Sequence, residues 1–101
     1  MSSVQAKLVT IITVFEARDI VLEALAALGV RGFSLSRVEG VGVHGKKRTG
    51  LVDADNVEFA IVTSEPLCAR ILEWVDGDLL ACHPGIAYSS DVVAVAAKVI
   101  E

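Results

Sequence analysis

The sequence predicts an α+β domain of the ferredoxin-like kind, in which the order βαββαβ closes a four-stranded antiparallel sheet with two helices on one face. Three observations lead to this prediction. The chain has 101 residues, which is enough for about one domain, so residues 1–101 are predicted to form a single domain. Hydrophobic residues make up 53% and charged residues 22%, a balance that closes a packed core and argues against disorder. An aliphatic strand pattern followed by an amphipathic helix pattern occurs twice along the chain.

The first βαβ half follows a short polar leader, residues 1–6, which we expect to be flexible. The run KLVTIITVF, residues 7–15, is β-branched and continuous, as in a strand buried on both faces. Residues 16–28 place apolar side chains at i, i+4 and i+7 and are followed by Gly29, a typical helix stop. From Gly32 to about Gly40, apolar and serine side chains alternate, which predicts a second strand.

The second half begins after a long loop, residues 40–56, which carries four of the eight glycines, three adjacent cations and two aspartates. A loop of this length in a compact domain is usually functional, and we expect it to be mobile. Residues 57–63 repeat the strand pattern, and Glu65-Pro66 opens a helix that should end at residues 76–78. Residues 79–85 then lead to a last strand within residues 86–100.

All three apolar strands carry hydrophobic side chains on both faces, although this topology covers only one face with helices. Leaving even about five large apolar side chains in water would cost on the order of 10 kcal/mol, comparable with the whole stability of such a domain. We therefore expect an obligate oligomer built through the open sheet face. In the last strand, we expect Val93 or Val95 to lie on that face.

Composition and motifs exclude several classes of function. Aromatic residues are only 5% and the net charge is −4, which argues against a nucleic-acid partner. His44, Cys82 and His83 are candidate metal ligands, but Cys82 and His83 are neighbours that normally point in different directions, and no third ligand stands at a characteristic spacing. Cys68 fits a small core position, so no metal site is predicted. No nucleophile–base or paired-carboxylate motif is found, and we expect no enzyme. No secretory signal or membrane span is indicated, which predicts a cytoplasmic protein.

Two segments are candidates for binding. Lys46-Lys47-Arg48 places a third of the positive charge in a loop flanked by glycines, where backbone N–H groups and cations can approach a phosphate or carboxylate, although the P-loop pattern is absent. A solvated loop tip is the alternative. Gly32 and Ser34 stand at the start of a strand, where a glycine and a hydroxyl can contact a sugar or base edge.

Three segments resemble the PII-like signalling proteins. They are KLVTIITVFEARDIVLEALAALG, GVRGFSLSRVEGVG and GIAYSSDVVAV, in that order, and the resemblance covers nearly the whole chain. It implies a homotrimer of ferredoxin-like subunits that binds adenine nucleotides in the clefts between subunits and docks on a target through the T-loop. The nucleotide-binding residues that it implies are Gly32, Phe33 and Ser34 for base and sugar, Gly40 and Gly42 at the loop base, and Lys46, Lys47 and Arg48 for the phosphates.

Departures from the nitrogen-signalling members favour a short-loop branch linked to bicarbonate transport and carboxysomes. No tyrosine lies between Gly40 and Asn56, so the uridylylation site is missing, and LLACHPG does not resemble the family's B-loop. The resemblance thus implies a non-enzymatic regulator that binds AMP, ADP, cyclic AMP or ATP without an obligatory cofactor. Bicarbonate is an expected co-ligand, and a bicarbonate or other transporter is an expected partner, which would bring the protein to a membrane. The alternative is a CutA-like trimer that binds divalent metals, favoured by the histidine and cysteine content.

Overall fold

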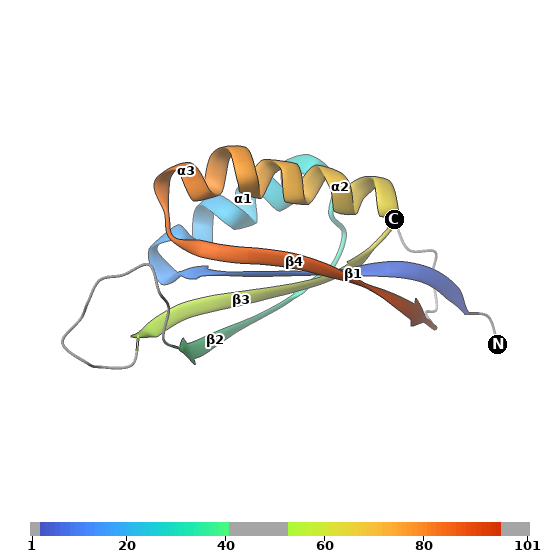
Figure 1. The fold of residues 1–101 in the computed structure, drawn as a ribbon, viewed down its shortest axis with the longest axis horizontal. Coiled ribbons are helices and arrows are strands. Elements are labelled where there is room, and N and C mark those ends of the chain that lie inside the picture. The colour runs from blue at the N-terminus through green and yellow to red at the C-terminus, as the bar shows by residue number, and fades with distance from the viewer. Residues whose placement is uncertain (1–2, 41–52, 96–101) are drawn as a thin grey trace.

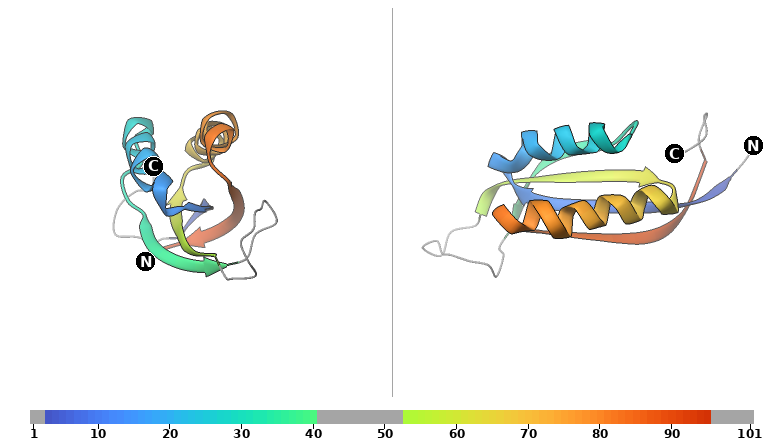
Figure 2. Two further views of the ribbon diagram at one scale, coloured as in Figure 1. Left: turned by 90° about the vertical axis from the view of Figure 1, so that its left-hand side faces the viewer. Right: turned by 90° about the horizontal axis from the view of Figure 1, so that it is seen from above.

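A four-stranded antiparallel sheet carries the helices on one face (Figure 1). The computed structural model describes residues 3–40 and 53–95, and every structural statement below concerns these residues. Across the sheet the strands follow the order β2 (Ser34–Gly40), β3 (Asp53–Thr63), β1 (Val4–Val14) and β4 (Gly85–Ala94). The helices α1 (Arg18–Leu28) and α2 (Glu65–Trp74) lie side by side over the sheet (Figure 2). The predicted ferredoxin-like arrangement is confirmed.

The core lies between the sheet and the helices. β1 pairs with both β3 and β4. Residues that lie opposite one another in such a pairing, for example Ile11 and Phe59, have their side chains on the same face of the sheet. The residues of this face and of the facing helices are almost completely buried: Val9, Ile11, Val57, Phe59 and Ile61 from the strands, and Val21, Leu25 and Ile71 from the helices. The continuous aliphatic strands of the sequence therefore supply one packed face each.

Local signals explain where the helices begin and end. Ser64 caps α2, with its Oγ accepting from the N–H of Leu67 at 3.5 Å, and Pro66 occupies the first turn. Gly29 ends α1 in the left-handed conformation, φ 92°, which a glycine adopts without steric cost. None of the helices in the described ranges is long and apolar enough to cross a membrane.

Three predicted boundaries are wrong. β1 begins at Val4, so residues 4–6 of the expected leader are strand residues that pair with β4. The expected loop, residues 40–56, is shorter, because Gly40 belongs to β2 and residues 53–56 belong to β3. Residues 41–52 lie outside the described part of the chain. The first helix is preceded by a 3₁₀ turn, Phe15–Ala17, so α1 starts at Arg18.

The second helix does not end at Asp76-Gly77-Asp78. It continues through a π-helical turn, Val75–Leu79, into α3 (Leu80–Cys82). Val75 and Leu79 are both almost completely buried. Their burial against the core outweighs the weak helix propensity of the Asp-Gly-Asp sequence, because tertiary packing routinely overrides local propensity.

The other face of the sheet carries no helix, and we call it the open face. The cross-strand register places Ile12 and Ile86 opposite each other on it, and likewise Thr10 and Tyr88. The same register puts Val92 on the open face, opposite Ala6, whereas Val93 points to the other side with Gln5. The expectation that Val93 or Val95 is the open-face valine of the last strand is therefore wrong, since it assumed the register one residue out of phase.

Candidate functional site

The start of β2 carries three of the residues that the resemblance assigns to a nucleotide. Gly32 precedes the strand, and no heavy atom lies within 4 Å of the position where a Cβ would stand, so its backbone is open to approach. Phe33 is 41% exposed, and its ring centroid lies 6.0 Å from that of Phe59. Ser34 is exposed and lies opposite Ala60.

The faces of these residues differ. Phe33 contacts Phe59, which points into the core, whereas Ser34 pairs with Ala60 on the open face. One ligand can therefore contact the backbone of this segment, but within a single subunit it cannot lie against both the Phe33 ring and the Ser34 hydroxyl on the same side of the sheet. β2 is an edge strand of the sheet, so one side of its backbone pairs with no other strand of the described residues.

The other predicted site residues lie at or in the loop between β2 and β3. Gly40 is the last residue of β2 and pairs with Asp53, and a Cβ at this position would again meet nothing within 4 Å. The remaining four fall outside the described residues: Gly42, Lys46, Lys47 and Arg48.

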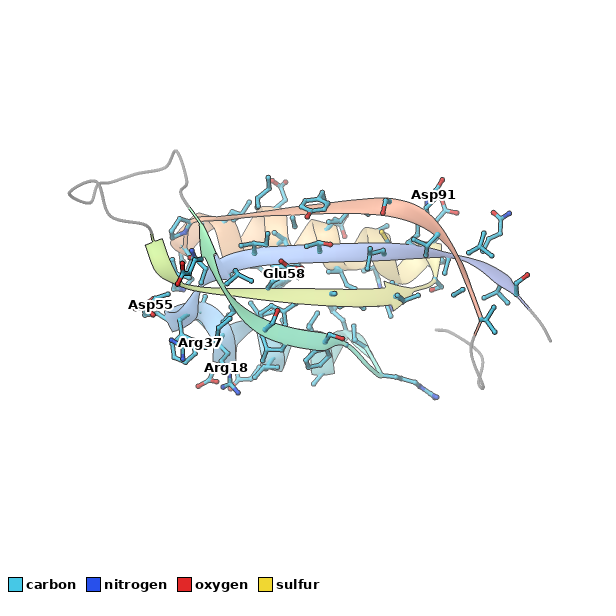
Figure 3. All side chains as sticks on the ribbon, turned by 90° about the horizontal axis from the view of Figure 1, so that it is seen from below. Arg18, Arg37, Asp55, Glu58 and Asp91 are labelled. Atoms are coloured by element: carbon cyan, nitrogen blue, oxygen red, sulfur yellow. The ribbon has the colours of Figure 1, made fainter. Side chains whose placement is uncertain are left out.

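A polar cluster that the sequence does not reveal lies at the root of this loop. The guanidinium carbon of Arg37, on β2, lies 4.2 Å from the centroid of the Phe15 ring, and its Nη2 donates to the carboxylate of Asp55, on β3, at 3.2 Å. Close to this cluster, the pairing of β2 with β3 shifts its register between Val38 and Gly40. Figure 3 shows Arg37 beside Asp55, with Arg18 nearby. The cluster ties together the two strands from which the loop departs.

The open face is the second candidate site, as an interface. Its members lie on all four strands, and the large apolar ones on β4 are well exposed, Ile86 at 55% and Tyr88 at 50%. The register assigns to this face Ser34, Ser36, Val38, Asn56, Glu58, Ala60, Val62, Val4, Ala6, Leu8, Thr10, Ile12, Ile86, Tyr88, Ser90, Val92 and Ala94. Exposed apolar surface of this kind is typical of a face that contacts another molecule.

Metal-ligating side chains do not gather in the ranges that the structure describes, where no group of three His, Cys, Asp or Glu residues could hold an ion. Cys68 is buried in the core and Cys82 is exposed, and both are free thiols. The backbone N–H of His83 donates to the carbonyl oxygen of Leu79 at the end of the helix. His44 lies outside the described residues.

Comparisons with solved structures place the fold. A PII-like signalling protein from Thermus thermophilus superposes with a TM-score of 0.78 and 26% identity, covering 94% of each chain. CPII, a nitrogen regulatory PII-like protein from Thiomonas intermedia whose structure is bound to ADP, AMP and bicarbonate, gives a TM-score of 0.79 at 20% identity, covering 94% of this chain and 98% of CPII. Bacillus subtilis GlnK, in complex with ATP, gives 0.69 at 22% identity over 87% and 82% of the chains.

Sequence comparison gives the same result at the level of the family. No relative is found among curated protein sequences. The family described as "Nitrogen regulatory protein P-II" matches residues 6–97, which include all four strands except the first two residues of β1, and both main helices. The chain therefore belongs to the nitrogen regulatory protein P-II family.

Proposed function

We propose that this chain is a non-enzymatic PII-like regulator that binds an adenine nucleotide in clefts between the subunits of a homotrimer. The observation that carries the proposal is the family match over residues 6–97. It is supported by the likeness in fold to CPII, of which one structure is bound to ADP, AMP and bicarbonate and another to ADP and bicarbonate. An adenine nucleotide, with bicarbonate as a co-ligand, is the ligand that we propose here.

The open face supports the trimer. Ile86 and Tyr88 are about half exposed, and Val62 and Val4 add apolar surface at 44% each. Burying a large apolar side chain contributes roughly 1.5 to 3 kcal/mol, so covering even part of this face with another copy contributes a substantial free energy of association. Packing of open faces around a three-fold axis buries this surface in every subunit.

Light scattering tests the assembly. The wild type should have about three times the 10.6 kDa mass of one subunit. Replacing Ile86 with Asp places a charge on the open face and should dissociate the trimer. Leu80→Asp is the matched control, because Leu80 lies on α3, away from the sheet, and is itself exposed. A wild-type protein that stays monomeric at all concentrations would refute the trimer.

The nucleotide site is proposed at the exposed start of β2 and in the following loop. Gly32, Phe33 and Ser34 are the proposed contacts for base and sugar, made through the exposed backbone of this segment because the Phe33 and Ser34 side chains lie on opposite faces. Gly40 and Gly42 are proposed at the loop base. The phosphates are assigned to Lys46, Lys47 and Arg48. The loop then responds to the ligand and regulates a partner, for which a bicarbonate or other transporter is proposed, with the protein acting from the cytoplasm.

Calorimetric titration with AMP, ADP, ATP and cyclic AMP, followed by divalent metal ions, tests the ligand. We expect an adenine nucleotide to bind and metals alone not to bind. In the triple variant with Ala at positions 46–48, ADP binding should weaken about ten- to a hundredfold, because a charge-assisted hydrogen bond contributes roughly 1.5 to 3 kcal/mol. Adenosine binding should hardly change. Metal binding without nucleotide binding would favour the CutA-like alternative.

A further inference from the structure

One charged side chain lies on the open face as far as the structure describes it. Glu58 is on β3, an inner strand, and is half-buried. Its cross-strand neighbours are Ser36 on β2 and Ile12 on β1. Seen from below the sheet, Glu58 lies apart from Arg37 at the loop root and from Asp91 on β4 (Figure 3).

No cation compensates Glu58 on this face within the described residues. The residues two positions away on its own strand are Asn56 and Ala60, so all the adjacent positions on the open face are uncharged. The ion pairs of the described residues use the carboxylates of Asp19, Asp55 and Asp91 instead. In the single subunit the carboxylate of Glu58 keeps part of its contact with water.

Assembly changes these surroundings, because a second copy brings another open face against the first, and the described residues of that face likewise include Glu58 and no cation. A carboxylate taken out of water without a cation costs several kcal/mol, and hydroxyl donors offset only part of that. We propose that Glu58 weakens the subunit association relative to an uncharged side chain at this position. This inference rests on the proposed trimer. A ligand bound between subunits can then shift the assembly equilibrium by mass action.

Glu58→Gln tests this directly, because it keeps the shape of the side chain and removes the charge. Sedimentation velocity over a dilution series at constant pH and salt should show half-dissociation of the variant at a concentration at least tenfold lower than that of the wild type. Glu58→Lys should give no such tightening, since the described open face offers no carboxylate once Glu58 is replaced. Glu73→Gln, on the exposed outer side of α2, is the matched control and should not shift the curve.

If the wild type does not dissociate on dilution, the same comparison is made by urea dissociation, in which Glu58→Gln should raise the midpoint. An unchanged or weaker assembly in Glu58→Gln would overturn the inference and leave the trimer intact. A monomeric wild type would instead refute the proposed trimer, so the two failures are distinguishable.

Discussion

Adding one methyl group at Gly85 should destabilise the protein by about 1–3 kcal/mol, the usual cost of inserting a methyl group into a closely packed position. A Cβ at Gly85, the first residue of β4, would stand 2.6 Å from the carbonyl oxygen of Ile12 and 3.1 Å from the Cβ of Thr13. The carbonyl belongs to the backbone of β1, so it cannot rotate away as a side chain can. The hydroxyl of Thr13 donates to the carbonyl of Pro84 at 2.8 Å, and displacement of β4 would strain this bond as well.

Urea and thermal unfolding of Gly85→Ala at fixed protein concentration measure the effect. A loss of about 1–3 kcal/mol corresponds to a melting temperature lower by roughly 5–20 °C for a domain of this size. Gly77→Ala is the matched control, because a Cβ at Gly77 meets nothing within 4 Å and alanine favours the helical turn by roughly 0.5–1 kcal/mol. A Gly85→Ala variant as stable as Gly77→Ala would show that β1 and β4 separate without cost, and the packing argument would be wrong.

Two surface interactions give further expectations. The hydrogen bond to Asp91 raises the pKa of Lys7 above its ordinary value of 10.5, so this pair stabilises the protein below pH 10.5 and the contribution is lost as pH rises through the raised pKa. Urea midpoints measured from about pH 8 to 11.5 should therefore fall more steeply for the wild type than for Asp91→Asn; parallel curves would contradict this. Arg37→Ala removes the contacts with Phe15 and Asp55 and should cost about 0.5–1 kcal/mol in urea unfolding, whereas Arg37→Lys should recover part of the loss; equal stability of all three proteins would contradict the role of the cluster.

Most of the fold could be predicted from the sequence because periodicity determines it locally. The helix stop at Gly29 and the start at Glu65-Pro66 are where the sequence indicates them. The errors arise where distant residues decide the outcome. Residues 4–6 form a strand because residues 92–94 pair with them, and the helix passes through Gly77 because the turn around it buries side chains in the core.

The candidate site was less predictable, for the same reason. Gly32 and Ser34 are exposed on an edge strand, but the opposite faces of Phe33 and Ser34 depend on the pairing of β2 with β3. The ion pair of Arg37 with Asp55 joins residues 18 positions apart and depends on the register shift between the two strands. For Glu58 the sequence offers only a weak indication, namely a carboxylate inside an otherwise apolar strand pattern. The face of the sheet on which Glu58 lies follows only from the register of the strands.

The position of β1 at the centre of the sheet also determines the order in which the protein can fold. Its two neighbours are β3 and β4, so the N-terminal strand finds both partners far along the chain, and the Lys7–Asp91 contact spans 84 positions. Pairings at such sequence separation carry a large loop-closure entropy and slow the folding of a chain. During synthesis, both edges of this aliphatic strand remain unpaired until β3 has left the ribosome, and one edge remains so until β4 follows. An unpaired apolar strand is prone to aggregation, so chaperone demand should be highest in that interval.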